Sequence, residues 1–467
     1  MKDSGKRINR RNFLKTVGAA GVGSVLTGKT IFADTNEPDV KGDVLHKMQV
    51  ELEYGSGSVK LSLPEKQVMG VYMPAGGEAM GEVSEALKVA LRKPIGTKPL
   101  GQIAKPKDKV VIVVDDVTRD VPSAELLLPV VDELRKAGVP DKNITVIAAL
   151  GLHRKMKQDE LDAVLGPLKG KIKIVNHDCE KNLQSIGKTS LGTEVYLNKI
   201  FLEADVKILT GDVEYHQFCG YGGGAKSVFP GLGDGASITL SHSRMELEGT
   251  GAGRLKGNPI REEIDEIGRK VGVDFIVNVV INSDKKVSAI LAGDVYKAFA
   301  AGAKACDKIY SVEVPKAADV VIASAGGFPR DIVLYQAQKA VEAARRIVKK
   351  GGKIILFAEC REGHGSELAY QWACEATKPE DIVVRLRKKF VMGGHKAYQL
   401  ARASQWADIY ICSSMDPAMV RKFFLHPLGS VDEVYSLIDK GDKIAVLPQA
   451  TTTLARLKGS KETRFLN

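Results

Sequence analysis

Short apolar runs rich in β-branched residues alternate with longer amphipathic stretches along most of the chain. Residues 109–114 predict a strand, residues 123–137 a helix and residues 144–149 a second strand. Residues 206–209 and 275–281 continue the series as further strands. This alternation is typical of βαβ units, in which helices connect the strands of a largely parallel sheet.

A second series of the same kind begins near residue 316. The expected strands of this series cover residues 318–323, 353–357, 408–412 and 443–447, and the expected helix covers residues 331–349. A chain of 467 residues also exceeds the size at which a single hydrophobic core keeps growing. The predicted fold class is therefore α/β, as two α/β lobes with mainly parallel sheets and their border near residues 300–316.

The start of the chain has a different character. Arg10 and Arg11 precede Phe13, Leu14 and a weakly apolar run rich in glycine and alanine, which resembles a twin-arginine export signal ending near residue 33. The run is too short and too rich in glycine for a stable membrane span. A surface amphipathic helix is the alternative. With an export signal, the protein would leave the cytoplasm already folded, through the twin-arginine machinery, and reside in the periplasm.

Three segments follow from these patterns. Residues 1–33 are the expected signal peptide, residues 34–310 the N-terminal α/β domain and residues 311–467 the C-terminal α/β domain. The formal charge of +11 is concentrated at the start, because residues 1–33 carry seven basic side chains and one acidic one. The remainder has a charge of about +5, which gives little support to a nucleic-acid partner.

The most informative stretch covers residues 211–242. It contains His216, then Lys226 ten residues later and His242 sixteen residues after that, although the whole chain has only eight histidines. The run Gly222, Gly223 and Gly224 permits a backbone with positive φ and the close approach of a ligand. Site chemistry explains this combination better than packing alone.

Two other interpretations of the glycine-rich stretch are open. The sequence GYGGGAKS resembles a phosphate-binding loop, but Ala225 stands where that motif requires a glycine before the lysine. A plain structural turn is the second alternative. The six cysteines include no CxxC pair, so neither a zinc site nor a dense disulfide framework is indicated, and Cys219 is the only cysteine inside the informative stretch.

Further polar residues follow the predicted strands, at the edge where ligands collect in open α/β sheets. We expect these loops to converge on one active-site cleft between the lobes. The residues concerned are Asp116, Arg119 and His153 in the first lobe, and Tyr335, Gln336 and Lys339 in the second. Each also has a structural interpretation: Asp116 could cap the next helix and pair with Arg119, His153 could be solvated, and Tyr335 with Lys339 could form an exposed helix face.

Four ordered blocks together give a resemblance to a known family. The blocks are DDVTR at 115–119, GLHR at 151–154, the spacing from His216 through Lys226 to His242, and GGFPRDIVLYQAQK at 326–339. On these residues the chain resembles the nickel-dependent lactate racemases. Their cofactor is a nickel pincer nucleotide, pyridinium-3-thioamide-5-thiocarboxylic acid mononucleotide with nickel.

The resemblance implies a role for each candidate residue. Lys226 would form a thioamide with the cofactor, and His242 would bind nickel. Gly222, Gly223 and Gly224 would lie beside the cofactor, and Asp116 would lie beside the cofactor or beside Arg119. His153 and His216 would exchange the hydroxyl proton, since histidine titrates near neutrality. Arg119, Tyr335, Gln336 and Lys339 would bind the substrate.

The implied reaction is racemisation or 2-epimerisation of a 2-hydroxy acid. Hydride transfer to the cofactor and back through a 2-keto acid is easier than removal of a weakly acidic proton by a side chain. His395 or Lys396 stands near the position of a pocket tryptophan in the family, so we expect a larger or more polar substrate than lactate. The host must supply cofactor-biosynthesis proteins. A nucleotide hydrolase and an exported solute-binding protein without catalysis are the alternatives.

Overall fold

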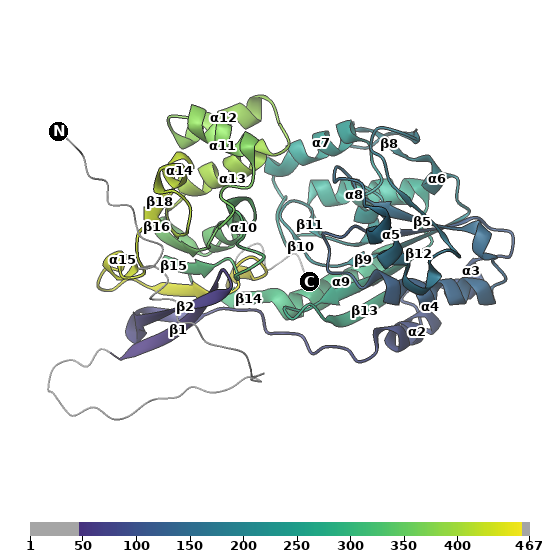
Figure 1. Cartoon of the computed structure of the whole chain (residues 1–467), viewed down its shortest axis with the longest axis horizontal. Coiled ribbons are helices and arrows are strands. Elements are labelled where there is room, and N and C mark those ends of the chain that lie inside the picture. Colours follow the sequence, from purple (N-terminus) through teal and green to yellow (C-terminus); the bar gives the residue numbers. More distant parts are fainter. Residues whose placement is uncertain (1–45, 460–467) are drawn as a thin grey trace. The chain divides into compact units, whose positions relative to one another are not determined.

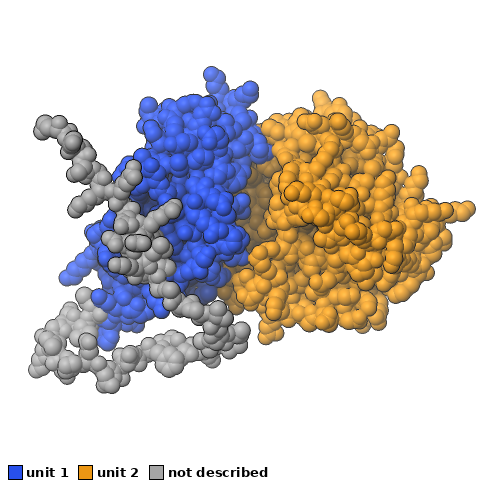
Figure 2. Space-filling view, in the orientation of Figure 1, with its two compact units in different colours: residues 1–73, 313–457 blue, residues 74–312, 458–467 orange. Residues whose placement is uncertain are grey.

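The computed structural model describes residues 46–459, so the expected export signal lies outside the described part. The chain divides into two compact units (Figure 2). The described part of unit 1 comprises residues 46–73 and 313–457, and that of unit 2 comprises residues 74–312 and 458–459. Within residues 46–459, no helix is both long enough and apolar enough to span a membrane.

Unit 2 contains a six-stranded sheet in the order β13, β12, β9, β4, β5, β6. These strands are β4 (Val110–Asp115), β5 (Ile144–Ala149), β6 (Lys173–Asn176), β9 (Val206–Asp212), β12 (Phe275–Ile281) and β13 (Val287–Gly293). All neighbours are parallel except β12 and β13. In β4 the first five residues are all buried, because both faces of the strand are covered. The expected strands of this lobe are thus confirmed.

Helices pack against this sheet (Figure 1). The helices of unit 2 are α2 (Val83–Arg92), α3 (Leu100–Ile103), α4 (Ser123–Lys136), α5 (Gln158–Leu165), α6 (Lys199–Leu202), α7 (Gly235–Ser243), α8 (Pro259–Val271) and α9 (Val295–Tyr310). Small antiparallel pairs are formed by β7 (Leu183–Lys188) with β8 (Glu194–Asn198), and by β10 (Tyr215–His216) with β11 (Gly220–Tyr221). In α4, apolar side chains at helical spacing, including Leu127 and Val131, enter the core beside Ile112.

The strand order of unit 2 reverses between β4 and β9. The chain proceeds from β4 to β5 and β6 on one side, and from β9 to β12 and β13 on the other. The loops after β4 and β9 therefore diverge from the ends of adjacent strands, where open α/β sheets bind ligands. Residues 116–119 follow β4, and the stretch with both histidines and Lys226 follows β9.

Unit 1 has its own six-stranded sheet, in the order β18, β17, β16, β15, β19, β3, and it is entirely parallel. These strands are β3 (Val68–Val71), β15 (Ala318–Ser324), β16 (Val348–Phe357), β17 (Asp408–Cys412), β18 (His426–Leu428) and β19 (Ile444–Leu447). Its helices are α10 (Leu334–Arg345), α11 (Glu367–Glu375), α12 (Pro379–Lys388), α13 (Gly394–Ser404), α14 (Pro417–Lys422) and α15 (Glu433–Ser436). A further pair joins β14 (Ser311–Val314) with β20 (Leu454–Leu457).

Residues 46–73 belong to unit 1, which differs from the expected N-terminal domain of residues 34–310. The hairpin of β1 (Lys47–Tyr54) and β2 (Gly57–Pro64) places Leu52 and Leu61 in one hydrophobic cluster with Ile322. Strand β3 pairs with β19, far along the chain. A local pattern of apolar residues cannot reveal such a distant partner.

The helix expected at residues 331–349 is shorter at both ends. The carboxylate of Asp331 accepts hydrogen bonds from the backbone N–H groups of Gly55, at 2.7 Å, and Glu359, at 3.0 Å, so this residue anchors a loop before α10 begins. At the other end Val348 already belongs to β16. Tertiary contacts therefore outweigh the local helical pattern at both boundaries.

Candidate active site

Asp116 and His153 form a hydrogen-bonded pair at the carboxyl ends of β4 and β5. His153 Nδ1 lies 2.6 Å from Asp116 Oδ2, while Asp116 Oδ1 accepts from the backbone N–H of Thr118 at 2.8 Å and from its hydroxyl at 2.5 Å. Asp116 is 8% exposed. Burial opposes its ionisation, but the hydrogen bonds from His153 and Thr118 prevail and lower the pKa of Asp116 to about 2.

Asp116 determines which ring nitrogen of His153 carries the proton. Because Asp116 is ionised, a neutral His153 carries its proton on Nδ1 and donates it to the carboxylate, which leaves the Nε2 lone pair available. The His153 side chain is 53% exposed, so this nitrogen can accept a proton from a bound molecule. Asp116 does not cap α4, whose N-cap residue, Pro122, has no side-chain cap bond. That structural interpretation of Asp116 is wrong.

Arg119 pairs with Glu214 rather than with Asp116. Its Nη1 donates to Glu214 Oε1, and both side chains are about one-third exposed. The charge of Glu214 raises the pKa of Arg119 further, against the opposing effect of burial. Glu214 follows β9 by two residues, so the contact joins the loops after two adjacent strands. Sequence reasoning missed this carboxylate because its partner lies on a different strand.

Two carboxylates at the strand ends were also missed. Asp115 ends β4 and Asp212 ends β9, and the backbone N–H of Asp212 donates to Asp115 Oδ2 at 3.3 Å. Burial raises the pKa of both carboxyl groups, whereas the charges of Arg119 and Lys226 lower it. Both carboxylates are therefore within electrostatic range of Lys226. In the sequence, the two adjacent aspartates at positions 115 and 116 were the signal that could have pointed to this part of the site.

The glycine-rich loop is shaped by contacts with the protein itself. Gly223 and Gly224 adopt positive φ angles of 76° and 59°, as expected. A Cβ at Gly223 would lie 2.7 Å from the carbonyl oxygen of Asp212, and one at Gly224 would lie 2.9 Å from Cγ of Phe299. A Cβ at Gly222 would lie 3.3 Å from Cγ of Glu214. The side-chain directions of these glycines are thus filled by protein atoms, so a residue with a Cβ would not fit at Gly223 or Gly224. Their expected place beside a cofactor stays a prediction.

The loop also differs from a phosphate-binding loop. The backbone N–H of Gly224 donates to Asn278 Oδ1 at 2.9 Å, and that of Lys226 donates to the carbonyl of Gly223 at 3.3 Å. Residues Gly224–Ser227 form a 3₁₀ turn, and the next α-helix begins only at Gly235. A phosphate cradle requires unpaired amides at the start of a helix that follows the lysine directly. The nucleotide-hydrolase alternative therefore loses its structural basis.

His242 is oriented by its own helix, α7. Its Nδ1 lies 2.9 Å from the carbonyl oxygen of Ile238, one turn earlier, so Nδ1 carries the proton and Nε2 keeps its lone pair. Burial lowers the pKa of His242, and the positive charge of Lys226 acts in the same direction. A neutral imidazole with an anchored Nδ1–H is the form that binds a metal through Nε2. His242 fits the implied role of a nickel ligand.

His216 is held in a different way. Its Nδ1 accepts hydrogen bonds from the backbone N–H groups of Phe218 and Cys219, both at 3.3 Å, which places the proton of the neutral ring on Nε2. The ring of Phe218 lies edge-on to both histidines, at centroid distances of 5.7 Å from His216 and 6.0 Å from His242. Cys219 itself is buried, and burial raises the pKa of its thiol, so it is not a reactive thiolate.

Lys226 lies among these groups. Its positive charge lowers the pKa values of Asp115, Asp212 and His242, so the ammonium lies within electrostatic range of all three groups. Among the described residues it forms no ion pair. Residues 46–459 also contain no group of three or more His, Cys, Asp or Glu side chains that could hold a metal alone. The implied cofactor needs one lysine and one histidine from the protein, and Lys226 with His242 fits that requirement.

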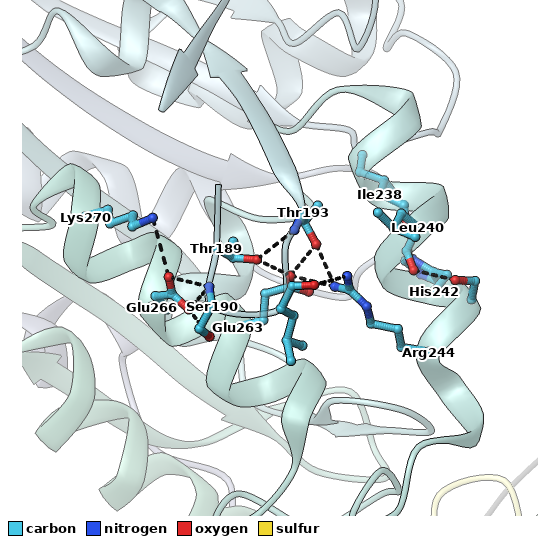
Figure 3. A network of polar contacts seen from close by, with 12 residues as sticks. Thr189, Ser190, Thr193, Ile238, Leu240, His242, Arg244, Glu263, Glu266 and Lys270 are labelled. Carbon is cyan, nitrogen blue, oxygen red and sulfur yellow. Dashed lines mark hydrogen bonds and ion pairs between the residues drawn. The ribbon is translucent and has the colours of Figure 1, made fainter. Parts of the chain in front are cut away.

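A buried polar network holds the end of α7 (Figure 3). Arg244 Nη1 donates to Glu263 Oε1 at 2.7 Å and to the hydroxyl of Thr193 at 2.6 Å. Thr189 and Thr193 also donate to Glu263, at 2.7 and 2.5 Å. The side chain of Glu263 is fully buried, and that of Arg244 is 14% exposed. Since Arg244 follows His242 by two residues, this network fixes the helix that carries the candidate nickel ligand.

The expected substrate residues of unit 1 lie on two helices in contact, α10 and α13. Lys396 Nζ lies 4.9 Å from the centroid of the Tyr335 ring, and the His395 ring lies edge-on to Tyr335 at 6.4 Å. His395 and Lys396 are buried, Tyr335 and Gln336 are half-buried, and Lys339 is exposed. The structure brings Tyr335, His395 and Lys396 together, so Tyr335 is not part of a plain exposed face.

Comparisons with known proteins agree with this arrangement. Residues 54–252 match the lactate racemase N-terminal domain, and residues 314–454 match the lactate racemase C-terminal domain. The chain is 32% identical over 425 residues to the lactate racemase of Thermoanaerobacterium thermosaccharolyticum, covering 88% of this chain and 99% of the relative. It is 28% identical over 423 residues to the lactate racemase of Lactiplantibacillus plantarum, covering 87% and 99%.

Solved structures give the same relationship. The lactate racemase apoprotein from T. thermosaccharolyticum superposes with a TM-score of 0.81 at 31% identity, over 88% of this chain and all of the other. A protein from Thermotoga maritima, at 19% identity and a TM-score of 0.59, shares the fold over 82% of this chain and all of its own. The matches cover both units and all four sequence blocks. The chain therefore belongs to the lactate racemase family.

Proposed function

We propose that this protein is a racemase or 2-epimerase of a 2-hydroxy acid, with a nickel pincer nucleotide bound covalently to Lys226. The proposal rests chiefly on His242, whose Nδ1 is anchored to its own helix 2.9 Å from the Ile238 carbonyl oxygen. Its neutral Nε2 suits a nickel ion, and Lys226 is near enough to lower the pKa of the ring. When bound, the cofactor would supply a hydride acceptor that returns the hydride to either face of the substrate carbon.

The residues of this chain handle the proton of the substrate hydroxyl. His153, with Asp116 on its Nδ1, offers Nε2 as the general base. His216 presents an Nε2–H because its Nδ1 accepts from two backbone N–H groups. We assign to His216 the exchange of the hydroxyl proton when the opposite enantiomer of the substrate is bound. Asp116 acts through His153, so we propose it as a positioning residue rather than a cofactor ligand.

Arg119 is the proposed ligand of the substrate carboxylate. Its guanidinium has five N–H donors, and the contact with Glu214 through Nη1 leaves others for a carboxylate. Glu214 therefore fixes the orientation of the guanidinium. Tyr335, Gln336 and Lys339 stay predictions as substrate contacts.

The protein would receive its cofactor before it reaches its final location. Cofactor-biosynthesis proteins of the host would supply the nucleotide in the cytoplasm, and the twin-arginine machinery would then export the folded, loaded protein to the periplasm. This order is required because the export route carries folded proteins, whereas the cofactor is made inside the cell.

The decisive test is an intact-mass measurement with nickel analysis. The protein would be purified from a strain that makes the cofactor, beside the variants Lys226→Arg and His242→Ala. We expect a nucleotide-sized adduct on the Lys226 peptide with about one nickel per chain, since one ligand set binds one ion. Lys226→Arg should lack the adduct, and His242→Ala should keep the adduct with less nickel. Unmodified wild-type protein from that strain would favour a non-catalytic solute-binding protein.

A further inference from the structure

Arg261 is a fully buried cation next to the loop that carries Lys226. Its side chain is 1% exposed. It lies on α8, where Nη2 donates to Asp265 Oδ1 at 2.6 Å, and its guanidinium carbon lies 3.9 Å from the centroid of the Phe299 ring. Within residues 46–459, its Nε has no hydrogen-bond partner. A buried ion pair with an unpaired N–H is seldom more stable than apolar side chains of the same size, so stability alone does not explain this arginine.

The third nitrogen of Arg261 contacts the glycine-rich loop. Nη1 donates to the carbonyl oxygen of Gly223 at 3.3 Å, and the backbone N–H of Lys226 donates to the same carbonyl, also at 3.3 Å. On the other side of that peptide bond, the N–H of Gly224 donates to Asn278 Oδ1 at 2.9 Å. Side chains from α8 and β12 therefore hold both polar atoms of the peptide bond between Gly223 and Gly224.

This peptide bond needs such support. Glycine populates many backbone conformations, so two adjacent glycines do not by themselves fix the orientation of the peptide bond between them. A Cβ at Gly224 would lie 3.0 Å from Arg261 Nη2, so the guanidinium also packs directly against the turn. The turn Gly224–Ser227 begins at this peptide bond and has Lys226 at its third position. A series of contacts thus links Asp265 through Arg261 to the backbone of Lys226.

The proposed cofactor makes the position of Lys226 critical. It would be attached to Lys226 while its nickel binds His242, so both groups must be held at fixed positions. His242 is oriented by the Ile238 carbonyl of its own helix, as described above. On the side of the lysine, Asn278 is 0% exposed and is fixed by its Nδ2, which donates to the carbonyl of Gly211 at 3.2 Å.

We propose that Arg261, held by Asp265, is a positioning residue for cofactor attachment, because it fixes the backbone that carries Lys226. Asn278 has the same role on the other side of the peptide bond. This inference rests on the proposed function and names further residues on which that function depends.

The first test measures how fast Lys226 takes up the cofactor. Full-length apoprotein, from a strain without the cofactor-biosynthesis proteins, would be incubated with an extract of a strain that makes the cofactor. Mass spectrometry would follow the adduct on the Lys226 peptide. We expect loading to be about tenfold slower in Arg261→Met and in the double variant Arg261→Met with Asp265→Ala, which leaves no unpaired carboxylate. Arg261→Lys should be slowed less, because its ammonium can still donate to Gly223.

A second measurement needs no cofactor. Apoprotein would be treated with limiting N-hydroxysuccinimidyl acetate, and acetylation of the half-buried Lys226 would be compared with that of Lys142, an exposed lysine of unit 2. Release of the loop should make Lys226 more accessible, so its acetylation should be faster in the Arg261→Met variants. The control for lost stability is Leu134→Ala. Leu134 is 0% exposed, and its hydrophobic cluster includes no residue of 211–242, all of which are described.

The control should change neither acetylation nor loading per folded molecule. Wild-type rates of loading and acetylation in both Arg261→Met proteins would show that Arg261 does not position Lys226. Equal losses in Leu134→Ala, at the same folded fraction by circular dichroism, would reduce Arg261 to a general contribution to stability. If the wild-type protein takes up no cofactor, the proposed function is wrong, and acetylation alone then decides whether Arg261 holds the lysine.

Discussion

Asp116 shows how a single carboxylate can act without touching a ligand. It receives the Nδ1–H of His153 and two hydrogen bonds from Thr118, and it stays ionised at any pH well above 2. The carboxylate therefore selects the tautomer of His153 in which Nε2 can accept a proton. The same arrangement of carboxylate and imidazole supports general bases in unrelated enzymes.

This role predicts the behaviour of Asp116→Asn. The amide cannot favour the same tautomer, so kcat should fall by roughly 100-fold or more while KM changes little. Racemisation kinetics of the loaded enzyme would measure both constants, and nickel analysis would check that loading is unchanged. Thr118→Val, which removes one hydrogen bond to the same carboxylate, is the matched control. If Asp116→Asn lost the cofactor, Asp116 would contact the cofactor and would not act only by positioning His153.

Lys396 predicts an unusual dependence of stability on pH. Its folded-state pKa of about 7 lies below the unfolded value of 10.5. Between these values the unfolded chain binds more protons, so this lysine makes the free energy of unfolding rise with pH, and its full penalty is present below about pH 7. In the protein without ligand, Lys396→Met should therefore be more stable than wild type at pH 6, and the gain should shrink towards pH 10. Urea unfolding across this range measures it, and a gain independent of pH would contradict the pKa.

The candidate site residues that follow strands could be predicted from the sequence alone. The side chains and backbone groups that hydrogen-bond to them could not. His153, Lys226 and His242 stand in recognisable motifs. Glu214 has no motif, and it reaches Arg119 only because β4 and β9 are adjacent in the sheet. The tautomers of the histidines likewise depend on contacts such as the Ile238 carbonyl, which no residue pattern specifies.

At the scale of elements, α7 depends on the buried pair of Arg244 and Glu263. Replacing Arg244 by Met would leave a fully buried carboxylate with only two threonine hydroxyls. We expect a loss of about 3 kcal/mol in the free energy of unfolding, typical of a broken buried pair. Nickel affinity should fall about tenfold or more, because the support of the ligand helix is lost.

The control for Arg244→Met is Lys270→Met. Lys270 pairs with Glu266 near the surface at 3.4 Å, and both side chains are partly exposed. Such pairs contribute about 1 kcal/mol or less, so this variant should change unfolding and nickel affinity little. Chemical denaturation and nickel titration of the loaded proteins measure both quantities. An Arg244→Met protein with unchanged nickel affinity would show that the network has no role at the metal site.

Strands were easier to predict than the helix at residues 331–349. β5, β12 and β17 have the expected bounds, because buried parallel strands are short continuous apolar runs. The helix α10 is shorter because Asp331 anchors a loop and Val348 joins a sheet. The pattern therefore predicts where an element lies, and long-range contacts decide where it ends.

At the scale of the whole molecule, the two predicted lobes are present, but residues 46–73 belong to the later one. Deleting residues 1–73 should destabilise unit 1, because Leu52 and Leu61 leave its core and β19 loses its neighbour β3. Hydrogen exchange should increase mainly in residues 313–457, whereas the β4 and β5 strands of unit 2 should stay protected. Equal increases in both units would contradict the division of the chain.

The pairing of β3 with β19 also sets the order of events during synthesis. Val71 of β3 pairs with Val446 of β19. Although β3 is synthesised early, it therefore cannot join its sheet until nearly the whole polypeptide has left the ribosome. The sheet of unit 2, whose strands all lie between Val110 and Gly293, has no such delay. We expect the nascent chain to form this middle portion first, while its opening hairpin is still an exposed target for chaperones.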